Sequence, residues 1–344
     1  MNLVPGGVAV RLTVLLVAAW VSATGFAADP AKVDSLGSIE RLDERLDALL
    51  PREAVIEKLA EGFNWSEGPV WDPKTKELYF SDVPENVVFA WNEKQGVRQF
   101  LKPSGYTGST PRGGEPGSNG LLLEPGTGKL VLCQHGDRRV ARMGEQGKFD
   151  TLAGNYDGKR FNSPNDGAYK SNGDLYFTDP PYGLLKLNDD PAKEIPFNGV
   201  YRVAPDKTVT LLTQVMTFPN GIAFSPDEKF LYVAQSDPKS AIWRKFPVHA
   251  DGTLGEGALF FDATDRVGKF KGLPDGMKVD AAGNVFATGP GGVLIFSPDG
   301  KHLGTILTGE ATGNCCFGDD GSTLYIMADM YLCRVKTTTK GAGM

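Results

Sequence analysis

Short apolar segments, separated by turns rich in glycine, proline, asparagine and aspartate, fill the chain from about residue 55 onward. Segments of this length with frequent turn residues predict β-strands rather than helices. One unit recurs six times, and it consists of a polar residue, usually followed by glycine and an apolar residue, then a strand, a turn and another strand. The units begin at Glu67, Asn119, Asn165, Asn220, Asp275 and Asn314, at intervals of 39 to 55 residues.

A repeat of roughly 40–50 residues with several strands per unit is typical of a β-propeller. One small sheet cannot bury both of its faces alone, so such sheets stack around an axis. The repeats therefore predict an all-β fold, a six-bladed β-propeller spanning residues 55–338. Residues 56–59 are expected to supply a strand that closes the ring with the last blade.

The residues before the repeats follow different patterns. Residues 28–54 form an N-terminal extension in which the apolar spacing of residues 38–50 predicts a short amphipathic helix ended by Pro51. Residues 1–27 have the features of a signal peptide: a single charge at Arg11, an apolar run from Leu12 to Val21, and small residues before a cleavage point after Ala27. We therefore expect a periplasmic or secreted protein, with an uncleaved membrane anchor as the alternative.

Composition and charge argue against two classes of binding partner, nucleic acids and membrane surfaces. The formal net charge of −6 over 344 residues argues against nucleic-acid binding, and no polybasic segment indicates a membrane surface after signal cleavage. Four cysteines in a chain of this length do not make a disulfide framework. Buried free thiols are expected, and a bridge between Cys133 and Cys333 stays open.

The polar residue that opens each unit carries the main chemical prediction. Equivalent positions in a propeller point to equivalent places, so the six side chains are expected to converge at one mouth of the central channel. Carboxylate and amide oxygens are the ligands of hard cations such as Ca²⁺. Two buried carboxylates, Glu67 and Asp275, would repel each other without a cation, and a divalent ion matches their charge. The alternative is that Asn-Gly and Asp-Gly pairs only form tight turns.

Five motifs, in order, resemble the senescence-marker-protein/gluconolactonase family of regucalcin-like lactonases, and particularly its bacterial gluconolactonase branch. They are Ser66–Trp71, Arg160–Gly167, Pro219–Gly221, Pro274–Met277 and Asn314–Gly318, with further likeness at His135–Val140 and Tyr176–Gly183. The resemblance implies a six-bladed propeller with metal ligands at Glu67, Asn165, Asn220 and Asp275. It also implies that Arg160, Asn119 and His135 face the substrate, with a structural role for His135 as the alternative. Gln134 stands where that branch often has glutamate.

Together these features predict metal-assisted hydrolysis of a sugar-type lactone. A bound ion, Ca²⁺ or alternatively Mg²⁺, Mn²⁺ or Zn²⁺, would polarise the carbonyl, with Asp275 as general base and Asp166 orienting Asn165. Two alternatives stay open: phosphotriester hydrolysis at the same metal site, and a non-catalytic propeller that binds a ligand or protein around a structural Ca²⁺.

Overall fold

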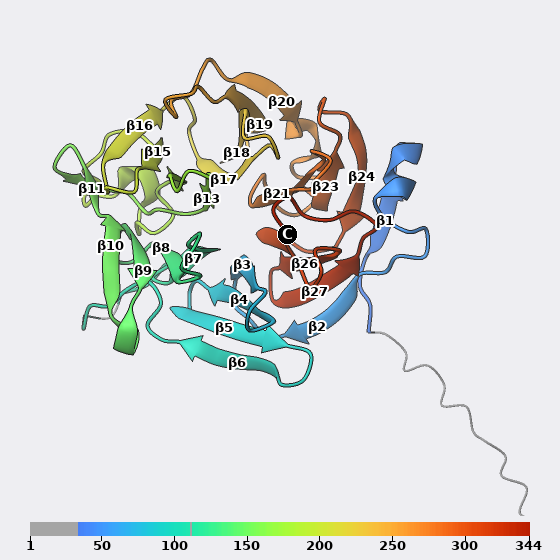
Figure 1. Ribbon diagram of the computed structural model, residues 1–344, viewed down its shortest axis with the longest axis horizontal. Coiled ribbons are helices and arrows are strands. Elements are labelled where there is room, and N and C mark those ends of the chain that lie inside the picture. The colour runs from blue at the N-terminus through green and yellow to red at the C-terminus, as the bar shows by residue number, and fades with distance from the viewer. Residues whose placement is uncertain (1–33, 111) are drawn as a thin grey trace, which may run out of the picture. The chain divides into compact units, whose positions relative to one another are not determined.

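The computed structural model describes residues 34–110 and 112–344. These residues form six antiparallel sheets of four or five strands around a common centre, as Figure 1 shows, and one further two-stranded sheet. The prediction of an all-β, six-bladed propeller is confirmed. The expected signal peptide, residues 1–27, lies outside the described residues. Within the described part of the chain, no helix is long and apolar enough to cross a membrane.

The first four blades each contain four strands that follow one another in the chain. Blade one consists of β3 (Ser66–Asp72), β4 (Glu77–Asp82), β5 (Val87–Asn92) and β6 (Gly96–Leu101). Blade two consists of β7 (Ser118–Leu123), β8 (Leu130–Gln134), β9 (Arg139–Met143) and β10 (Phe149–Ala153). Blade three consists of β13 (Gly167–Tyr169), β14 (Leu175–Asp179), β15 (Gly199–Val203) and β16 (Val209–Thr213). Blade four consists of β17 (Pro219–Phe224), β18 (Phe230–Asp237), β19 (Ser240–Pro247) and β20 (Ala258–Asp262).

The last two blades take strands from both ends of the described chain. Blade five contains β21 (Met277–Val279), β22 (Val285–Gly289), β23 (Gly292–Phe296) and β24 (His302–Leu307), with β1 (Ser38–Arg41) added outside β24. Blade six contains β25 (Asn314–Gly318), β26 (Thr323–Ala328) and β27 (Tyr331–Lys336), completed by β2 (Glu57–Glu61). Because β2 pairs with β27, the expected closing strand is observed.

The N-terminal extension is only partly helical. A 3₁₀ helix, η1, spans Glu44–Ala48, whereas Ser38–Arg41, expected as helix, forms the strand β1. The open edge of β24 offers unpaired backbone groups, and pairing with them satisfies the backbone of β1. The buried side chain of Leu46 then anchors η1 against blade five. Three other short elements lie in connections: η2 (Glu145–Gly147), η3 (Leu187–Asp189) and η4 (Thr264–Arg266), together with the hairpin of β11 (Asn155–Tyr156) and β12 (Lys159–Arg160).

The apolar core lies between neighbouring blades. Trp71 of blade one stacks on Tyr325 of blade six, with ring centroids 5.6 Å apart. Tyr176 of blade three meets Phe224 of blade four edge to face, with centroids 4.8 Å apart. Since each sheet buries its faces against its two neighbours, the blades hold the innermost strands in a ring around the axis.

Glycine after the opening polar residue allows the innermost strands to approach closely. A Cβ atom at Gly68 would overlap the carbonyl oxygen of Asn119 in the next blade, and one at Gly221 would overlap that of Asp275. Gly221 has no positive φ, so its role is close approach rather than a turn. The repeated glycine thus sets the spacing that brings the polar side chains together.

Replacing Gly221 with alanine is expected to lower the free energy of unfolding by about 1–3 kcal/mol, because backbone atoms must shift to admit the methyl group. Urea denaturation in the presence of chelator measures the change. Gly113→Ala is the matched control, because a Cβ there would have no neighbour within 4 Å. Equal stability of the two variants would contradict the close-approach explanation.

All four cysteines are free and buried, which answers the question left open for Cys133 and Cys333. These two residues belong to different apolar clusters, in blade two and blade six respectively. Burial raises the pKa of the Cys315 thiol to about 12, and that of Cys333 likewise to about 12. The thiols are therefore inert core residues.

Candidate functional site

The six repeated polar positions lie at one end of the central channel. Each lies within the first two positions of an innermost strand or two residues before it. These strands, β3, β7, β13, β17, β21 and β25, contact one another in a ring (Figure 1). Five of the side chains are at most 3% exposed: Glu67, Asn119, Asn165, Asn220 and Asn314. Asp275 retains partial exposure. The arrangement is an enclosed ring of carboxylates and amides with limited access to solvent.

The two carboxylates of the ring influence each other. Burial raises the pKa of Glu67 to about 8, and the bond from the Gly68 backbone N–H, 2.8 Å long, opposes only part of that rise. Burial also raises the pKa of Asp275 well above its usual range, and the charge of Glu67 is the next largest cause. The charge of Glu67 therefore acts on Asp275, whereas the charges of Asp166 and Glu115 act on Glu67. Two carboxylates that disfavour ionisation without a counter-charge suit a cation.

The amide of Asn220 is oriented by its neighbours. Its Nδ2 donates to Ser236 Oγ at 2.9 Å, and the Ser236 hydroxyl donates its own proton to the carbonyl oxygen of Pro274. Because its single proton goes to Pro274, the Ser236 hydroxyl can only accept a hydrogen bond from Asn220. The donor atom Nδ2 of Asn220 must therefore face Ser236, and Oδ1 points away from it. The Asn220 Oδ1 atom is buried and, among the described residues, has no donor. Asn119 Oδ1 is buried and unpartnered in the same way. A buried amide oxygen without a protein partner is rare, and a cation, a water or a ligand hydroxyl would satisfy it.

A third carboxylate lies in the channel beside the ring. Asp166 is buried, and its Oδ2 accepts from Asn314 Nδ2 across the axis at 3.4 Å. Burial raises the pKa of Asp166, and the Lys278 ammonium opposes part of that rise. Asp166 therefore holds Asn314, from the other side of the channel, in addition to standing next to Asn165 in the chain.

The segment that carries Asn165 is held by a buried aspartate. Asp179, at the end of β14, accepts the backbone N–H groups of Asn162 and Ser163, each at 2.8 Å. Burial raises the pKa of Asp179 to about 7. Because these bonds fix the turn before Asn165, the likeness at Tyr176–Gly183 has a structural explanation.

Two residues at this end of the channel escaped prediction from the sequence. The carboxylate of Glu115 lies 3.2 Å from Nδ1 of His135, which is fully buried, and its charge raises the pKa values of Glu67 and Asp275. Tyr182 lies near Ser236, Asn220 and Asp275, and its hydroxyl is unpartnered among the described residues. Glu115 comes from the long connection between β6 and β7, whose unusual length was the available signal. Tyr182 lies just after β14, within the motif Tyr176–Gly183.

Arg160 lies apart from the buried ring. It belongs to the exposed hairpin strand β12, and its guanidinium donates to the carbonyl oxygen of Asp137 at 3.2 Å. A substrate contact at Arg160 stays a prediction. His135 lies closer, since its Nε2 is 3.4 Å from Nδ2 of Asn165.

The donors of the ring fit a hard divalent cation. Glu67 and Asp275 supply two negative charges, and Asn220 supplies an amide oxygen that lacks any other partner. Among residues 34–110 and 112–344, no group of three or more histidine, cysteine, aspartate or glutamate side chains has metal-binding geometry. An ion in this ring would therefore depend on amide oxygens as much as on carboxylates.

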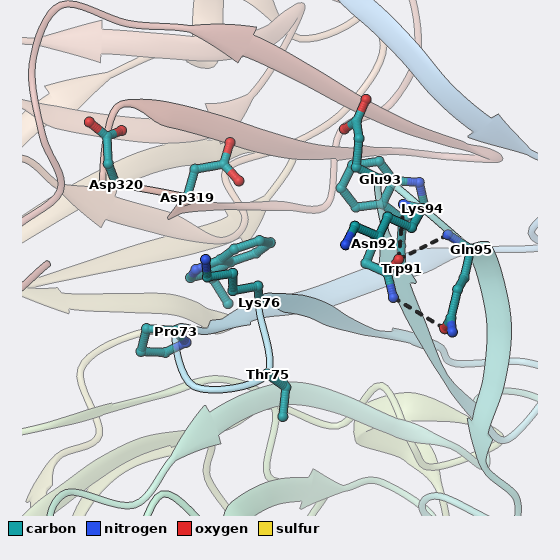
Figure 2. Close-up of a pocket in the computed structure, with 11 residues that line it drawn as sticks. Pro73, Thr75, Lys76, Trp91, Asn92, Glu93, Lys94, Gln95, Asp319 and Asp320 are labelled. Carbon is teal, nitrogen blue, oxygen red and sulfur yellow. Dashed lines mark hydrogen bonds between the residues drawn. The ribbon is translucent and has the colours of Figure 1, made fainter.

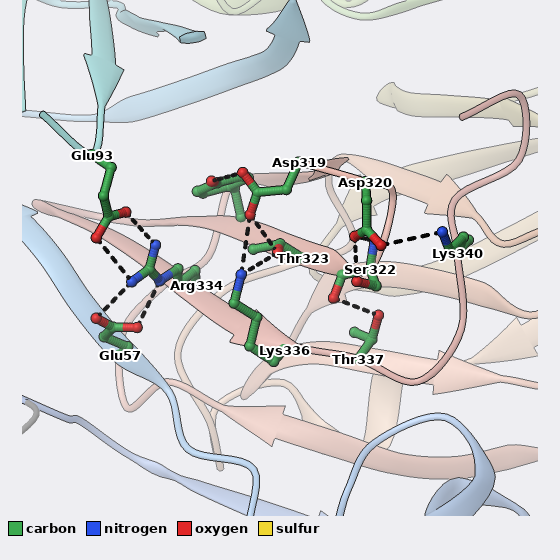
Figure 3. A network of polar contacts seen from close by, with 11 residues as sticks. Glu57, Glu93, Asp319, Asp320, Ser322, Thr323, Arg334, Lys336, Thr337 and Lys340 are labelled. Atoms are coloured by element: carbon green, nitrogen blue, oxygen red, sulfur yellow. Dashed lines mark hydrogen bonds and ion pairs between the residues drawn. The ribbon is translucent and has the colours of Figure 1, made fainter. Parts of the chain in front are cut away.

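Two other hollows lack this chemistry. A groove of 590 Å³ between the turns of blades one and six is lined in part by Trp71 and Trp91 (Figure 2). Its rim acids are each engaged by a cation or hydroxyl, in the pairs Glu93–Arg334, Asp319–Lys336 and Asp320–Lys340 (Figure 3). A cavity of 510 Å³ at the far end of the channel is lined mainly by the apolar ends of the innermost strands and the C-terminal residues 341–344. The polar ring is thus the best candidate for chemistry.

Fold and ring together define the class: a six-bladed β-propeller with an enclosed carboxylate–amide site on its axis. The family described as SMP-30/Gluconolactonase/LRE-like region matches residues 65–329. The gluconolactonase of Zymomonas mobilis is 42% identical over 320 residues, which cover 89% of this chain and 88% of that protein. The chain therefore belongs to the SMP-30/gluconolactonase/LRE-like family, as its motifs predicted.

More distant relatives agree with this membership. A solved gluconolactonase structure from Xanthomonas campestris is 31% identical, has a TM-score of 0.76, and is matched over 89% of this chain and 96% of that one. Regucalcin of Oryctolagus cuniculus is 26% identical over 78% of this chain and 84% of that protein. A calcium-binding regucalcin structure from Agrobacterium tumefaciens is 20% identical with a TM-score of 0.63, covering 83% of this chain and 94% of that one, and shows the shared fold.

Proposed function

We propose that this protein is a lactonase that opens sugar-type lactones with the help of one divalent ion, Ca²⁺ in the first instance, held by Glu67, Asn165, Asn220 and Asp275. Likeness to gluconolactonases at 42% and 31% identity supports the hydrolase class. The observation that carries the metal is the presence of two ring carboxylates with raised pKa values, Glu67 and Asp275, together with the unpartnered oxygen of Asn220. Phosphotriesters are the alternative substrate.

A divalent ion, when bound, would act as a Lewis acid toward the lactone carbonyl. Asp275 is suited to take the proton of the attacking water, because its carboxylate would stand beside the ion that activates that water. Attack on the carbonyl carbon breaks the ring C–O bond, and the proton passes to the leaving oxygen to give a hydroxy acid. Asn119 Oδ1 is free to accept a bond from a sugar hydroxyl, and the unpartnered Tyr182 hydroxyl is free to donate one.

A pH-stat assay on a panel of aldonolactones tests the function. We expect acid release that is lost in excess chelator and restored by Ca²⁺. Mg²⁺, Mn²⁺ and Zn²⁺ are added in parallel arms, and a phosphotriester substrate serves as a further arm. Absence of acid release from every lactone, with each metal present, would exclude the lactonase assignment.

A further inference from the structure

A buried contact chain reaches the ring from the long connection between β6 and β7. Glu115 Oε2 lies 3.2 Å from His135 Nδ1, and His135 Nε2 lies 3.4 Å from Asn165 Nδ2. The imidazole is completely buried, whereas the Glu115 side chain is 33% exposed. These contacts thus link a solvent-accessible carboxylate, Glu115, to an amide of the proposed metal site, Asn165.

Both ends of the connection that carries Glu115 are held by hydrogen bonds. Asn86 Oδ1 accepts the backbone N–H groups of Ser104, Gly105 and Tyr106 at 2.7 to 3.2 Å. Nearer Glu115, the Gly117 N–H donates to Val83 O at 2.9 Å. The carbonyl oxygen of Gly117 in turn accepts the His135 N–H at 3.1 Å. The backbone two residues after Glu115 is therefore tied both to blade one and to His135.

The charge of Glu115 and the tautomer of His135 depend on each other. His135 Nδ1 has no aligned hydrogen-bond partner among the described residues, but the Glu115 carboxylate 3.2 Å away favours a proton on Nδ1 of the neutral imidazole by its negative charge. Nε2 is then an acceptor, and the only group that Asn165 can offer to it is the Nδ2 donor. With Nδ2 committed to His135, the Oδ1 atom of Asn165 is left to face the axis. The opposite tautomer would attract Oδ1 and turn the amide nitrogen toward the proposed ion.

We infer that Glu115 and His135 are positioning residues that hold the Asn165 amide with its oxygen toward the channel axis. Ser236 imposes the same orientation on Asn220 by a different route, as a hydroxyl that donates to Pro274. Two of the amides in the ring are thus oriented from outside by partners that accept from their nitrogen. The inference rests on the proposed function, because an oriented oxygen matters only if it binds an ion.

The tautomer of His135 can be measured without metal or substrate. The chain has three histidines, so long-range ¹H–¹⁵N correlation spectra at a pH of about 8, where a free imidazole is neutral, are readily assigned by substitution. We expect His135 to carry its proton on Nδ1 in the wild type, and Glu115→Gln to populate the Nε2–H form. A wild-type His135 with its proton on Nε2 would overturn the inference.

Calorimetric titration with Ca²⁺ measures the consequence. Glu115→Gln is expected to weaken Ca²⁺ binding about 10- to 100-fold, the usual effect of losing a partner that orients a ligand. Glu85→Gln is the matched control, because Glu85 is an exposed carboxylate of the β4–β5 connection that bonds to Asn64 instead. It removes the same charge and is expected to leave the affinity within about twofold.

Conservative rescue separates positioning from packing. His135→Gln keeps an acceptor for Asn165 and is expected to bind Ca²⁺ more tightly than His135→Leu, which lacks one. Equal weakening by Glu115→Gln and Glu85→Gln, or wild-type affinity in Glu115→Gln, would overturn the inference. If a wild-type protein with Nδ1–H at His135 binds no divalent ion, the proposed metal function fails, and the orientation itself stands.

Discussion

Replacing Asp275 with asparagine is expected to lower kcat for lactone hydrolysis by about 10²- to 10⁴-fold, the usual contribution of a positioned general base. Asparagine has nearly the same shape and retains an oxygen, but it cannot accept the proton of the attacking water. The charge available to a bound cation also falls by one. Initial rates on the best aldonolactone of the panel, measured with saturating Ca²⁺, give the change in kcat.

The same variant is expected to stay folded. Burial and the charge of Glu67 both disfavour an ionised Asp275, so its removal relieves repulsion in the metal-free protein. The thermal midpoint of the chelated variant should equal or exceed that of the chelated wild type. Asp265→Asn, an exposed position in η4, makes the same charge change away from the ring and should keep wild-type kcat. Undiminished turnover in Asp275→Asn would remove Asp275 from the reaction.

In the metal-free protein, the free energy of unfolding is expected to fall as the pH rises from about 4 to about 8. The pKa values of Glu67 and Asp275 lie above their unfolded values, so the folded protein binds more protons than the unfolded chain in this window. Stability therefore decreases with increasing pH until Glu67 ionises near pH 8. Asp179, with a pKa of about 7, adds to the same trend.

Adding Ca²⁺ is expected to reverse most of this loss. The ion needs ionised carboxylates, so its stabilising effect should grow with pH over the same window. A free Ca²⁺ concentration of a hundred times Kd stabilises by about 2.7 kcal/mol, which corresponds to a rise in thermal midpoint of about 5 °C for a protein of this size. Scanning calorimetry at several pH values, with and without Ca²⁺, measures it.

Glu67→Gln provides the control for the pH dependence. It removes one of the two ring carboxyl groups with a raised pKa but leaves Asp179 in place. The free energy of unfolding of the metal-free variant should therefore still fall with pH, whereas the stabilisation by Ca²⁺ should be smaller than in the wild type. A Ca²⁺ effect of equal size at low and high pH in the wild type would contradict ligation by Glu67 and Asp275.

The predicted loss of kcat in Asp275→Asn and the predicted pH dependence of stability both concern residues that the repeat pattern identified. The position that opens each unit determined which side chains lie at the same end of the channel, because repeated units place equivalent residues at equivalent points of a ring. The following glycine is explained by close strand approach at Gly120, Gly221 and Gly276, whereas Gly68 also has a positive φ. Fold class, blade number and the closing strand Glu57–Glu61 were therefore contained in the sequence.

The surroundings of the ring were decided by the tertiary structure alone. Glu115 and Tyr182 come from connections that vary in length and path between blades, so no repeat aligns them with the ring. Asp166 bonds to Asn314, 148 residues later in the chain, because the two lie across the axis from each other. Ser38–Arg41 became a strand because the edge of β24 offered backbone partners, which outweighed a helical apolar spacing. Local patterns determine what each unit forms and which way it faces, whereas contacts between units far apart in the chain depend on the closed ring.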